Sequence, residues 1–158
     1  MVWQPRVERL RRLLPGLWAG MLLCTALIAT PAPFALLERA DAGRVVGRIF
    51  VQEAWLSLAL ALSLLAIERV RARRASELGQ GSVLSTEMLL ALGTVFCTVA
   101  GYFAIQPLLP AARAGQSVFS FGQLHAVSTL FFGLKTVLVL VLAWRVAKPA
   151  TVSPAPFS

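Results

Sequence analysis

Four ionisable side chains stand inside otherwise apolar stretches, and their types are the ones that could do chemistry. Arg48 and Glu53 share one stretch, and His125 and Lys135 share another. A charged group at the centre of a membrane helix costs about 2.5–3.5 kcal/mol on insertion scales, so such residues are functional candidates. With two uncharged polar residues they make up a predicted polar cavity: Arg48, Glu53, Gln106, His125, Ser128 and Lys135.

The predicted cavity offers binding chemistry. The neutral imidazole of His125 is a ligand for a metal ion or haem, and we predict it as the metal-binding residue if a metal is present. Glu53 would orient that imidazole or carry a proton. Lys135 follows His125 by ten residues, so it lies about 15 Å deeper in a helix and would neutralise an anionic group at the cavity floor. Ser128 precedes Lys135 by seven residues and shares its face.

A structural interpretation stands beside the functional one. Glu53 would pair with His125 or Arg48 and steady the helices. His125 near a membrane surface is often solvated, and Lys135 can extend its ammonium group towards water. Both interpretations place these groups in the membrane and differ in whether a ligand is needed.

Soluble-enzyme motifs are missing from the sequence. There is no Gly-rich phosphate loop, Cys-x-x-Cys pair, His-Glu-x-x-His segment or nucleophile elbow. One histidine does not supply a three-ligand zinc site. We therefore predict no catalytic residue and no cofactor, with metal or haem as the alternative, and we favour a protein that is not an enzyme.

The elements that position these residues are four apolar blocks. The chain has 158 residues, of which 58% are hydrophobic, and its mean hydropathy is +0.75. Each block is long enough to cross a bilayer as a helix, and continuous rather than alternating hydrophobicity excludes a barrel. We predict an all-α integral membrane four-helix bundle, with lipid as its partner. The predicted parts are a basic N-terminal segment at 1–12, spans at about 13–37, 46–67, 88–109 and 124–146 within a domain at 13–147, and a disordered tail at 148–158.

Orientation follows from Arg and Lys. The net charge is +8, and ten cations flank the spans on one side against four on the other. The positive-inside rule places the ten in the cytoplasm, with both termini, and we predict a multi-pass protein of the bacterial inner membrane. The basic residues lie in short clusters beside apolar blocks, without interleaved aromatics, so we expect no nucleic-acid partner.

The first span allows two further interpretations. A basic segment before an apolar block also occurs in cleaved signal peptides, but Pro33 directly follows the tempting site at Thr30-Pro31-Ala32, so we expect a permanent helix. Pro31 and Pro33 either end this helix or open its backbone towards a cavity.

The two halves of the chain resemble each other. Gly20, Cys24 and Thr25 match Gly93, Cys97 and Thr98 at an offset of 73, and Gly43 and Val46 match Gly115 and Val118 at 72. The repeat favours two parallel-related helical hairpins, with a site where the repeats meet. At the offset of 72, Glu53 corresponds to His125, which would place these two residues across an axis from each other.

Small residues recur every fourth position in two spans, which lets helix backbones approach closely. The predicted packing residues are Gly16, Gly20 and Cys24 in the first span, and Gly93, Cys97 and Gly101 in the third. A thiol metal site formed by both cysteines is the alternative.

Several of these segments together resemble the transmembrane-protein-205-like family (DUF4149). The segments are Leu17-Trp18-Ala-Gly20, Pro33-Phe34-Ala35, Gly43-Arg44-Val-Val-Gly47, Phe50 with Glu53, Gly101-Tyr102 and Leu124-His125-Ala-Val-Ser128. The resemblance covers about 13–147 and implies a small four-helix membrane protein of unknown function. A looser similarity links the chain to copper-resistance-D and membrane protoporphyrinogen-oxidase proteins. The chain departs from the oxidase pattern because His125 and Lys135 share one span and no second histidine exists.

Three hypotheses follow. The first is an inner-membrane protein with a small outward-facing polar cavity that binds or transports a small solute or metal ion. The second is a structural or accessory subunit that associates with another membrane protein or with copies of itself. The third is a haem- or metal-dependent redox protein.

Overall fold

Each apolar block forms a long helical rod in the computed structural model, which describes residues 5–79 and 82–148. The first rod is α1 (Pro5–Cys24), the π-helix η1 (Thr25–Ala29) and α2 (Pro31–Leu36), and the second is α3 (Arg39–Glu77). The third is α4 (Thr86–Thr98), the π-helix η2 (Val99–Ala104), the 3₁₀-helix η3 (Gln106–Leu108) and α5 (Leu109–Arg113), and the fourth is α6 (Phe121–Ala147). All four rods are long and apolar enough to cross a membrane, which confirms the predicted all-α four-helix class. Apart from Lys148, the tail predicted to be disordered lies outside the described residues.

Local sequence signals set the helix ends. Ser85 caps α4 by accepting a hydrogen bond from the Met88 amide, and Ser120 forms a capping box with Gln123 at the start of α6. Gly79 and Gly115 adopt φ of +69° after α3 and α5, a left-handed conformation that glycine adopts without steric cost. These signals divide the apolar sequence into helices of defined length.

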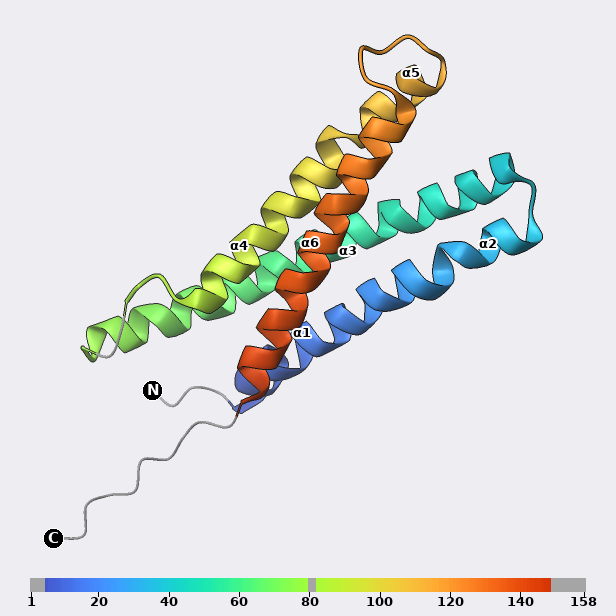
Figure 1. The fold of residues 1–158 in the computed structure, drawn as a ribbon. Helices are drawn as coiled ribbons and strands as arrows, with labels where there is room; N and C mark the ends of the chain where they lie inside the picture. Colours follow the sequence, from blue (N-terminus) through green and yellow to red (C-terminus); the bar gives the residue numbers. More distant parts are fainter. Residues whose placement is uncertain (1–4, 80–81, 149–158) are drawn as a thin grey trace, which may run out of the picture.

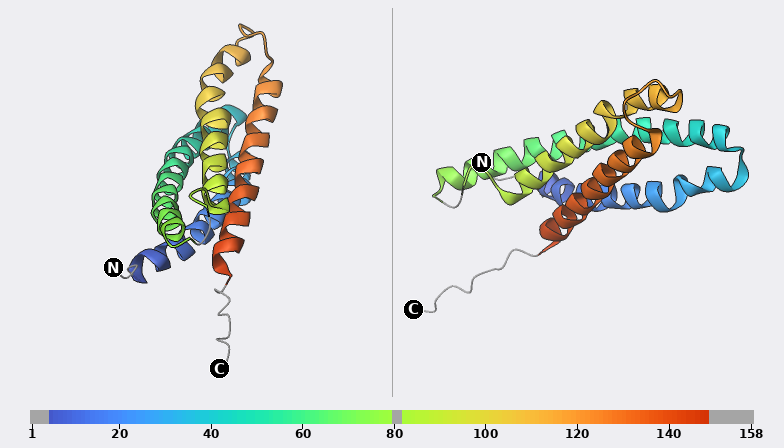
Figure 2. Two further views of the ribbon diagram at one scale, coloured as in Figure 1. Left: turned by 90° about the vertical axis from the view of Figure 1, so that its left-hand side faces the viewer. Right: turned by 45° about the horizontal axis from the view of Figure 1, so that its top comes forward.

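The rods form two hairpins that cross at an angle and have the same chain direction (Figure 1). The first hairpin holds α1, α2 and α3, and the second holds α4, α5 and α6. The start of α1, the end of α3, the start of α4 and the end of α6 lie at one end of the molecule, which we call the basic end. The turns that follow α2 and α5 lie at the other end, which we call the open end. The hairpins cross near the basic end and diverge towards the open end (Figures 1 and 2).

Two apolar clusters explain this shape. The larger one joins three helices from both hairpins in the half near the basic end: Trp18 and Leu22 of α1, Ala61 and Leu64 of α3, and Val139, Leu142 and Val146 of α6. The smaller one lies within the second hairpin at the open end and contains Ile105, Leu109, Ala112 and Leu124. The hairpins therefore share a core on one side only.

Ion pairs reinforce the basic end. Arg11 of α1 bonds to Glu68 of α3 at 3.0 Å, and both side chains are buried. Arg145 of α6 bonds to Glu87 of α4 at 3.0 Å. Arg11 and Arg145, which belong to the basic clusters beside the spans, thus also hold helices together.

The small residues of the first and third spans lie in different surroundings. A Cβ added to Gly101 would lie 2.5 Å from the Phe131 Cβ, so α4–η2 and α6 approach closely there. The interpretation of Gly16, Gly20 and Cys24 as packing residues is corrected within this chain. All three are exposed, and a Cβ on either glycine would meet nothing within 4 Å, because α1 packs through the face that carries Trp18, Ala19 and Leu22.

The repeat is visible in part of the structure. A π-helix follows Cys24 in the first hairpin and begins two residues after Cys97 in the second. The offset of 72 does not carry over to the returning helices, since Val46 lies in α3 whereas Val118 lies in the turn before α6. The second hairpin has a longer turn, which shifts α6 relative to α3.

Candidate functional site

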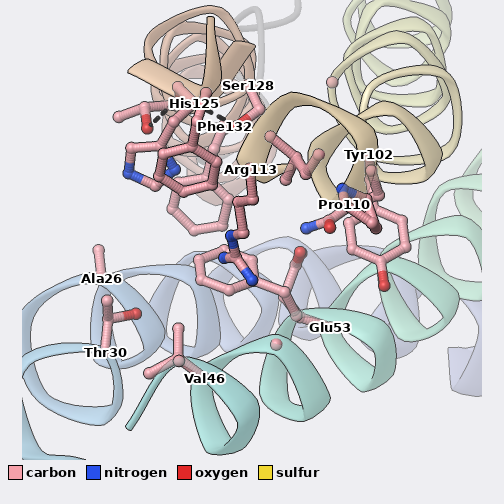
Figure 3. A pocket seen from close by; sticks show the side chains of 18 of the residues that line it. Ala26, Thr30, Val46, Glu53, Tyr102, Pro110, Arg113, His125, Ser128 and Phe132 are labelled. Atoms are coloured by element: carbon pink, nitrogen blue, oxygen red, sulfur yellow. Dashed lines mark hydrogen bonds between the residues drawn. The ribbon is translucent and has the colours of Figure 1, made fainter. Parts of the chain in front are cut away.

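A cavity of about 1200 Å³ lies between the diverging hairpins and opens at the open end. Every helical rod contributes to its walls. Figure 3 shows side chains of the two hairpins facing each other across it, with the Glu53 carboxylate directed inwards. Its polar lining residues are Thr30, Arg39, Glu53, Cys97, Thr98, Tyr102, Gln106, Arg113, His125, Ser128, Thr129 and Lys135.

Two stripes of side chains form opposite walls. Steps of four and three residues alternate along each helix, which keeps all five members on one face. The α3 stripe is Arg39, Gly43, Val46, Phe50 and Glu53, and the α6 stripe is Phe121, His125, Ser128, Phe132 and Lys135. Each stripe covers fourteen helical steps, or about 21 Å from mouth to base.

The base of the cavity is a buried ion pair. Lys135 Nζ donates to Glu53 Oε1 at 2.7 Å, and each side chain is only 3% exposed. Ser57 Oγ also donates to Glu53 Oε1, and Trp18 Nε1 donates to Ser57 Oγ at 3.0 Å. This chain of hydrogen bonds joins α1, α3 and α6 where the hairpins meet.

The ion pair retains unused hydrogen-bonding capacity. Within the described residues, Glu53 Oε2 accepts no hydrogen bond, and Lys135 uses one of its three donors. Buried polar atoms are normally satisfied by protein, water or ligand, so these atoms mark a place where a polar group can bind.

An aromatic pair lies one turn nearer the mouth than the ion pair. The rings of Phe50 and Phe132 meet edge to face, with centroids 5.4 Å apart. Lys135 Nζ lies 5.0 Å from the Phe132 centroid, a cation–π distance. The two rings bridge the hairpins between the mouth of the cavity and its polar base.

The mouth is cationic. Arg39 begins α3, and Arg113 ends α5 and lies 4.6 Å over the Phe121 ring. His125 is exposed and stacks on Phe121 with a centroid distance of 5.6 Å. Across residues 5–79 and 82–148, neither arginine has an acidic partner.

Irregular backbone lines the cavity on both sides. Ala26 belongs to η1, and Gly101 and Tyr102 belong to η2. Non-helical or π backbone at membrane depth is tolerated where it faces a cavity or is buried in protein, and π segments occur often at functional sites.

Pro31 and Pro33 do not end the first rod, because α2 begins at Pro31 and continues to Leu36. The irregular backbone that lines the cavity lies just before them, in the π-helix Thr25–Ala29.

The structure brings most, but not all, of the six residues of the predicted polar cavity together. Five of them line the cavity, whereas Arg48 is exposed and lies outside it. Glu53 pairs with Lys135 instead of His125 or Arg48, and His125 lies at the mouth on the 125–129 turn of α6. Among the described residues no three His, Cys, Asp or Glu side chains converge, and Cys24 is exposed while Cys97 lines the cavity.

Sequence reasoning missed several residues of the site. Arg39, Phe50 and Phe132 could have been found from the matching four-and-three spacing of positions 39–53 and 121–135, which places Glu53 and Lys135 at equivalent ends. Arg113 lies outside both segments, so this spacing does not identify it. No sequence signal marks Ser57 as the bridge between Trp18 and Glu53.

Residues 13–117 match the family described as "Domain of unknown function (DUF4149)". The chain belongs to the DUF4149 family. The matched range ends before α6 begins, so it includes the α3 wall with Glu53 but not the α6 wall with His125 and Lys135. No curated protein and no solved structure matches the chain.

Proposed function

We propose that this DUF4149 protein binds a small organic solute in the cavity between its hairpins and acts in solute binding or transport without catalysing a reaction. The observation that carries the proposal is the buried Glu53–Lys135 pair at the base of a cavity of about 1200 Å³. The positive-inside rule orients the basic end to the cytoplasm, so the cavity opens outwards.

General features of membrane proteins support a binding role. Ionisable residues inside membranes mark substrate or ion pathways, and sites in repeat-built transporters lie near the bilayer midplane where the repeats meet. The Glu53–Lys135 pair has both properties. Its free oxygen and free ammonium donors can bind a water molecule or a polar group at the base of the cavity.

The same pair favours an organic solute over a metal ion. The ammonium of Lys135 lies 2.7 Å from the one carboxylate oxygen that it engages, so it would repel a cation bound there. His125, the predicted metal residue, lies ten residues from Lys135 on the same helix and so about 15 Å away.

Filling the cavity tests this proposal. Gly43 lines the cavity, and a Cβ there would meet nothing within 4 Å, so the side chain of Gly43→Leu can extend into the cavity and reduce its volume. Gly20→Leu is the matched control because Gly20 faces outwards. We expect a panel of organic anions, zwitterions, cations and neutral solutes to contain members that raise the thermal unfolding midpoint of wild type and Gly20→Leu, but not of Gly43→Leu. The proposal is wrong if no solute distinguishes wild type from Gly43→Leu.

One observation favours an accessory subunit as the second candidate. The exposed Gly16, Gly20 and Cys24 face of α1 has the spacing at which a helix of another protein packs closely. Purification in mild detergent would then recover a partner with wild type and Gly43→Leu, and Gly20→Leu would lose it. Repeated recovery of a lone chain from wild type counts against this candidate.

A further inference from the structure

The charges that line the cavity are unevenly distributed. Glu53 and Lys135 neutralise each other at the base, whereas Arg39 and Arg113 lie at the mouth without acidic partners in the described part of the chain. Asp41, the acidic residue nearest to Arg39 within α3, pairs with Arg44 instead. The mouth of the cavity therefore attracts an anionic group. Between mouth and base, the lining attracts neither anions nor cations.

The walls between mouth and base are mostly apolar, and polar side chains among them such as Thr30, Gln106 and Ser128 carry no charge. From Arg39 to Phe50 the α3 wall extends eleven helical steps, or about 17 Å. The bulky side chains along this length are Phe34, Val46, Leu109, Phe121 and the Phe50–Phe132 pair. A groove with these walls matches a hydrocarbon body better than a polar one.

One side of the cavity faces the bilayer. His125 and Thr129 line the cavity and also a shallow apolar hollow on the outer face of α6, with Leu130 and Gly133. Helix α6 packs along α1 but makes no more than marginal contact with α2. In Figure 3, Ala26 and Thr30 lie across a gap from His125. A molecule dissolved in the membrane can therefore reach the groove beside α6.

Building on the solute-binding function, we propose that the ligand is a single-chain amphipathic anion, with a carboxylate or phosphate head on one hydrocarbon chain. Arg39 and Arg113 hold the head at the membrane surface, and charge-assisted hydrogen bonds from guanidinium groups suit both head groups. The chain follows the groove as far as Phe50 and Phe132, parallel to the surrounding lipid chains. The Glu53–Lys135 pair remains intact beneath the two rings.

The test is probe displacement in nanodiscs of phosphatidylcholine. Dansyl-undecanoate is titrated against the full-length protein, and unlabelled competitors are then added; we expect the probe to bind. We expect dodecanoate and dodecyl phosphate to displace the probe, and their ranking identifies the head group. Dodecyltrimethylammonium has the same chain and the opposite charge, and inorganic phosphate has a head and no chain, so neither should displace it.

Variants locate the head group. Arg39 and Arg113 are exposed, so a double Arg39→Gln, Arg113→Gln variant should fold normally. We expect it to bind the probe at least about tenfold more weakly, a loss of roughly 1.4 kcal/mol. Arg48→Gln is the matched control because Arg48 lies on the same helix, is exposed and does not line the cavity. Its affinity should equal that of wild type.

Contrary outcomes are distinct. Equal displacement by dodecyltrimethylammonium, displacement by inorganic phosphate, or wild-type affinity in the double variant would overturn the proposed ligand class. If dansyl-undecanoate does not bind while organic solutes still stabilise wild type over Gly43→Leu, the ligand class is wrong and the solute-binding function stands. If, in addition, no solute stabilises wild type more than Gly43→Leu, both the ligand class and the solute-binding function are wrong.

Discussion

At the scale of single residues, the Glu53–Lys135 pair dominates the energetics. Each charge would be costly alone inside a membrane helix, and their mutual attraction offsets that cost only while both are present. Ser57 and Trp18 extend the pair into a network that connects three helices. The network therefore fixes the positions of the hairpins at the base of the cavity, whatever the ligand.

Removing one member of the pair should destabilise the protein more than removing both. We expect Lys135→Met to cost about 3–5 kcal/mol, because it leaves the Glu53 carboxylate buried and uncompensated. Adding Glu53→Gln should recover most of that loss, since the amide is neutral and its oxygen still accepts from Ser57. Unfolding of the purified protein in mixed micelles by increasing SDS measures both effects. A single variant as stable as wild type would contradict a buried ion pair.

Ser57 offers a second test at this scale. It is fully buried and connects Trp18 Nε1 to Glu53, so Ser57→Ala leaves the indole donor unsatisfied. We expect a loss of about 1–3 kcal/mol in the same unfolding assay. Ser63→Ala is the matched control, because Ser63 is an exposed residue of α3 that bonds only to the Ala59 carbonyl. Equal stability of the two variants would show that the bridge is unimportant.

At the scale of the elements, helix faces with the same spacing have different surroundings. The Gly16, Gly20 and Cys24 face of α1 is exposed, whereas the Gly93, Cys97 and Gly101 face of the third rod packs against α6. Close approach needs a partner helix at the right place. The helices that contact α1 are α3 of its own hairpin and α6 of the second hairpin, and both pack against other faces of α1. Small-residue spacing alone therefore identifies a face that can pack, but not whether it does.

Alanine substitutions distinguish these faces. Gly101→Ala would place its Cβ 2.5 Å from Cβ of Phe131, which forces η2 and α6 apart. Overpacking of this kind typically costs about 1–3 kcal/mol, so we expect a clear fall in the thermal unfolding midpoint. Gly20→Ala should leave the midpoint unchanged or raise it, because its Cβ meets nothing within 4 Å. If Gly20→Ala lowered the unfolding midpoint more than Gly101→Ala does, another chain would have to pack against the Gly20 face of α1.

At the scale of the whole molecule, the two ends have opposite roles. The basic end is held by the shared apolar cluster and by the Arg11–Glu68 and Arg145–Glu87 pairs. At the open end an apolar cluster lies within the second hairpin, and the cavity lies between the hairpins. Exchange of the proposed solute would therefore take place at the open end, while the shared core keeps the basic end closed.

Cysteine labelling tests the orientation. In a Cys24→Ala, Cys97→Ala background, Ser82→Cys marks the turn at the basic end and Ser117→Cys marks the turn at the open end. With the basic end in the cytoplasm, a membrane-impermeant maleimide should label Ser117→Cys in intact cells. Ser82→Cys should react only after the cells are lysed. The reverse pattern would invert the topology and make the cavity open inwards.

The sequence by itself determined the membrane class and the number of candidate spans, and it predicts the side of each loop. These properties depend on local features of the sequence, namely the length of each apolar block and the positions of Arg and Lys around it. The four long apolar helices of the structure agree with the predicted number of spans. It also identified ionisable residues within the spans, because charge in an apolar block is visible without knowing its neighbours.

Only the tertiary structure decided which of these residues meet. The repeat suggested Glu53 opposite His125, but the longer turn before α6 shifts that helix and brings Lys135 to Glu53. The exposure of Arg48 and of the α1 glycine face, and the divergence of the hairpins that opens the cavity, likewise depend on rotation and tilt of whole helices. Those quantities are set by packing between distant residues such as Trp18, Leu64 and Val139, which no local pattern encodes.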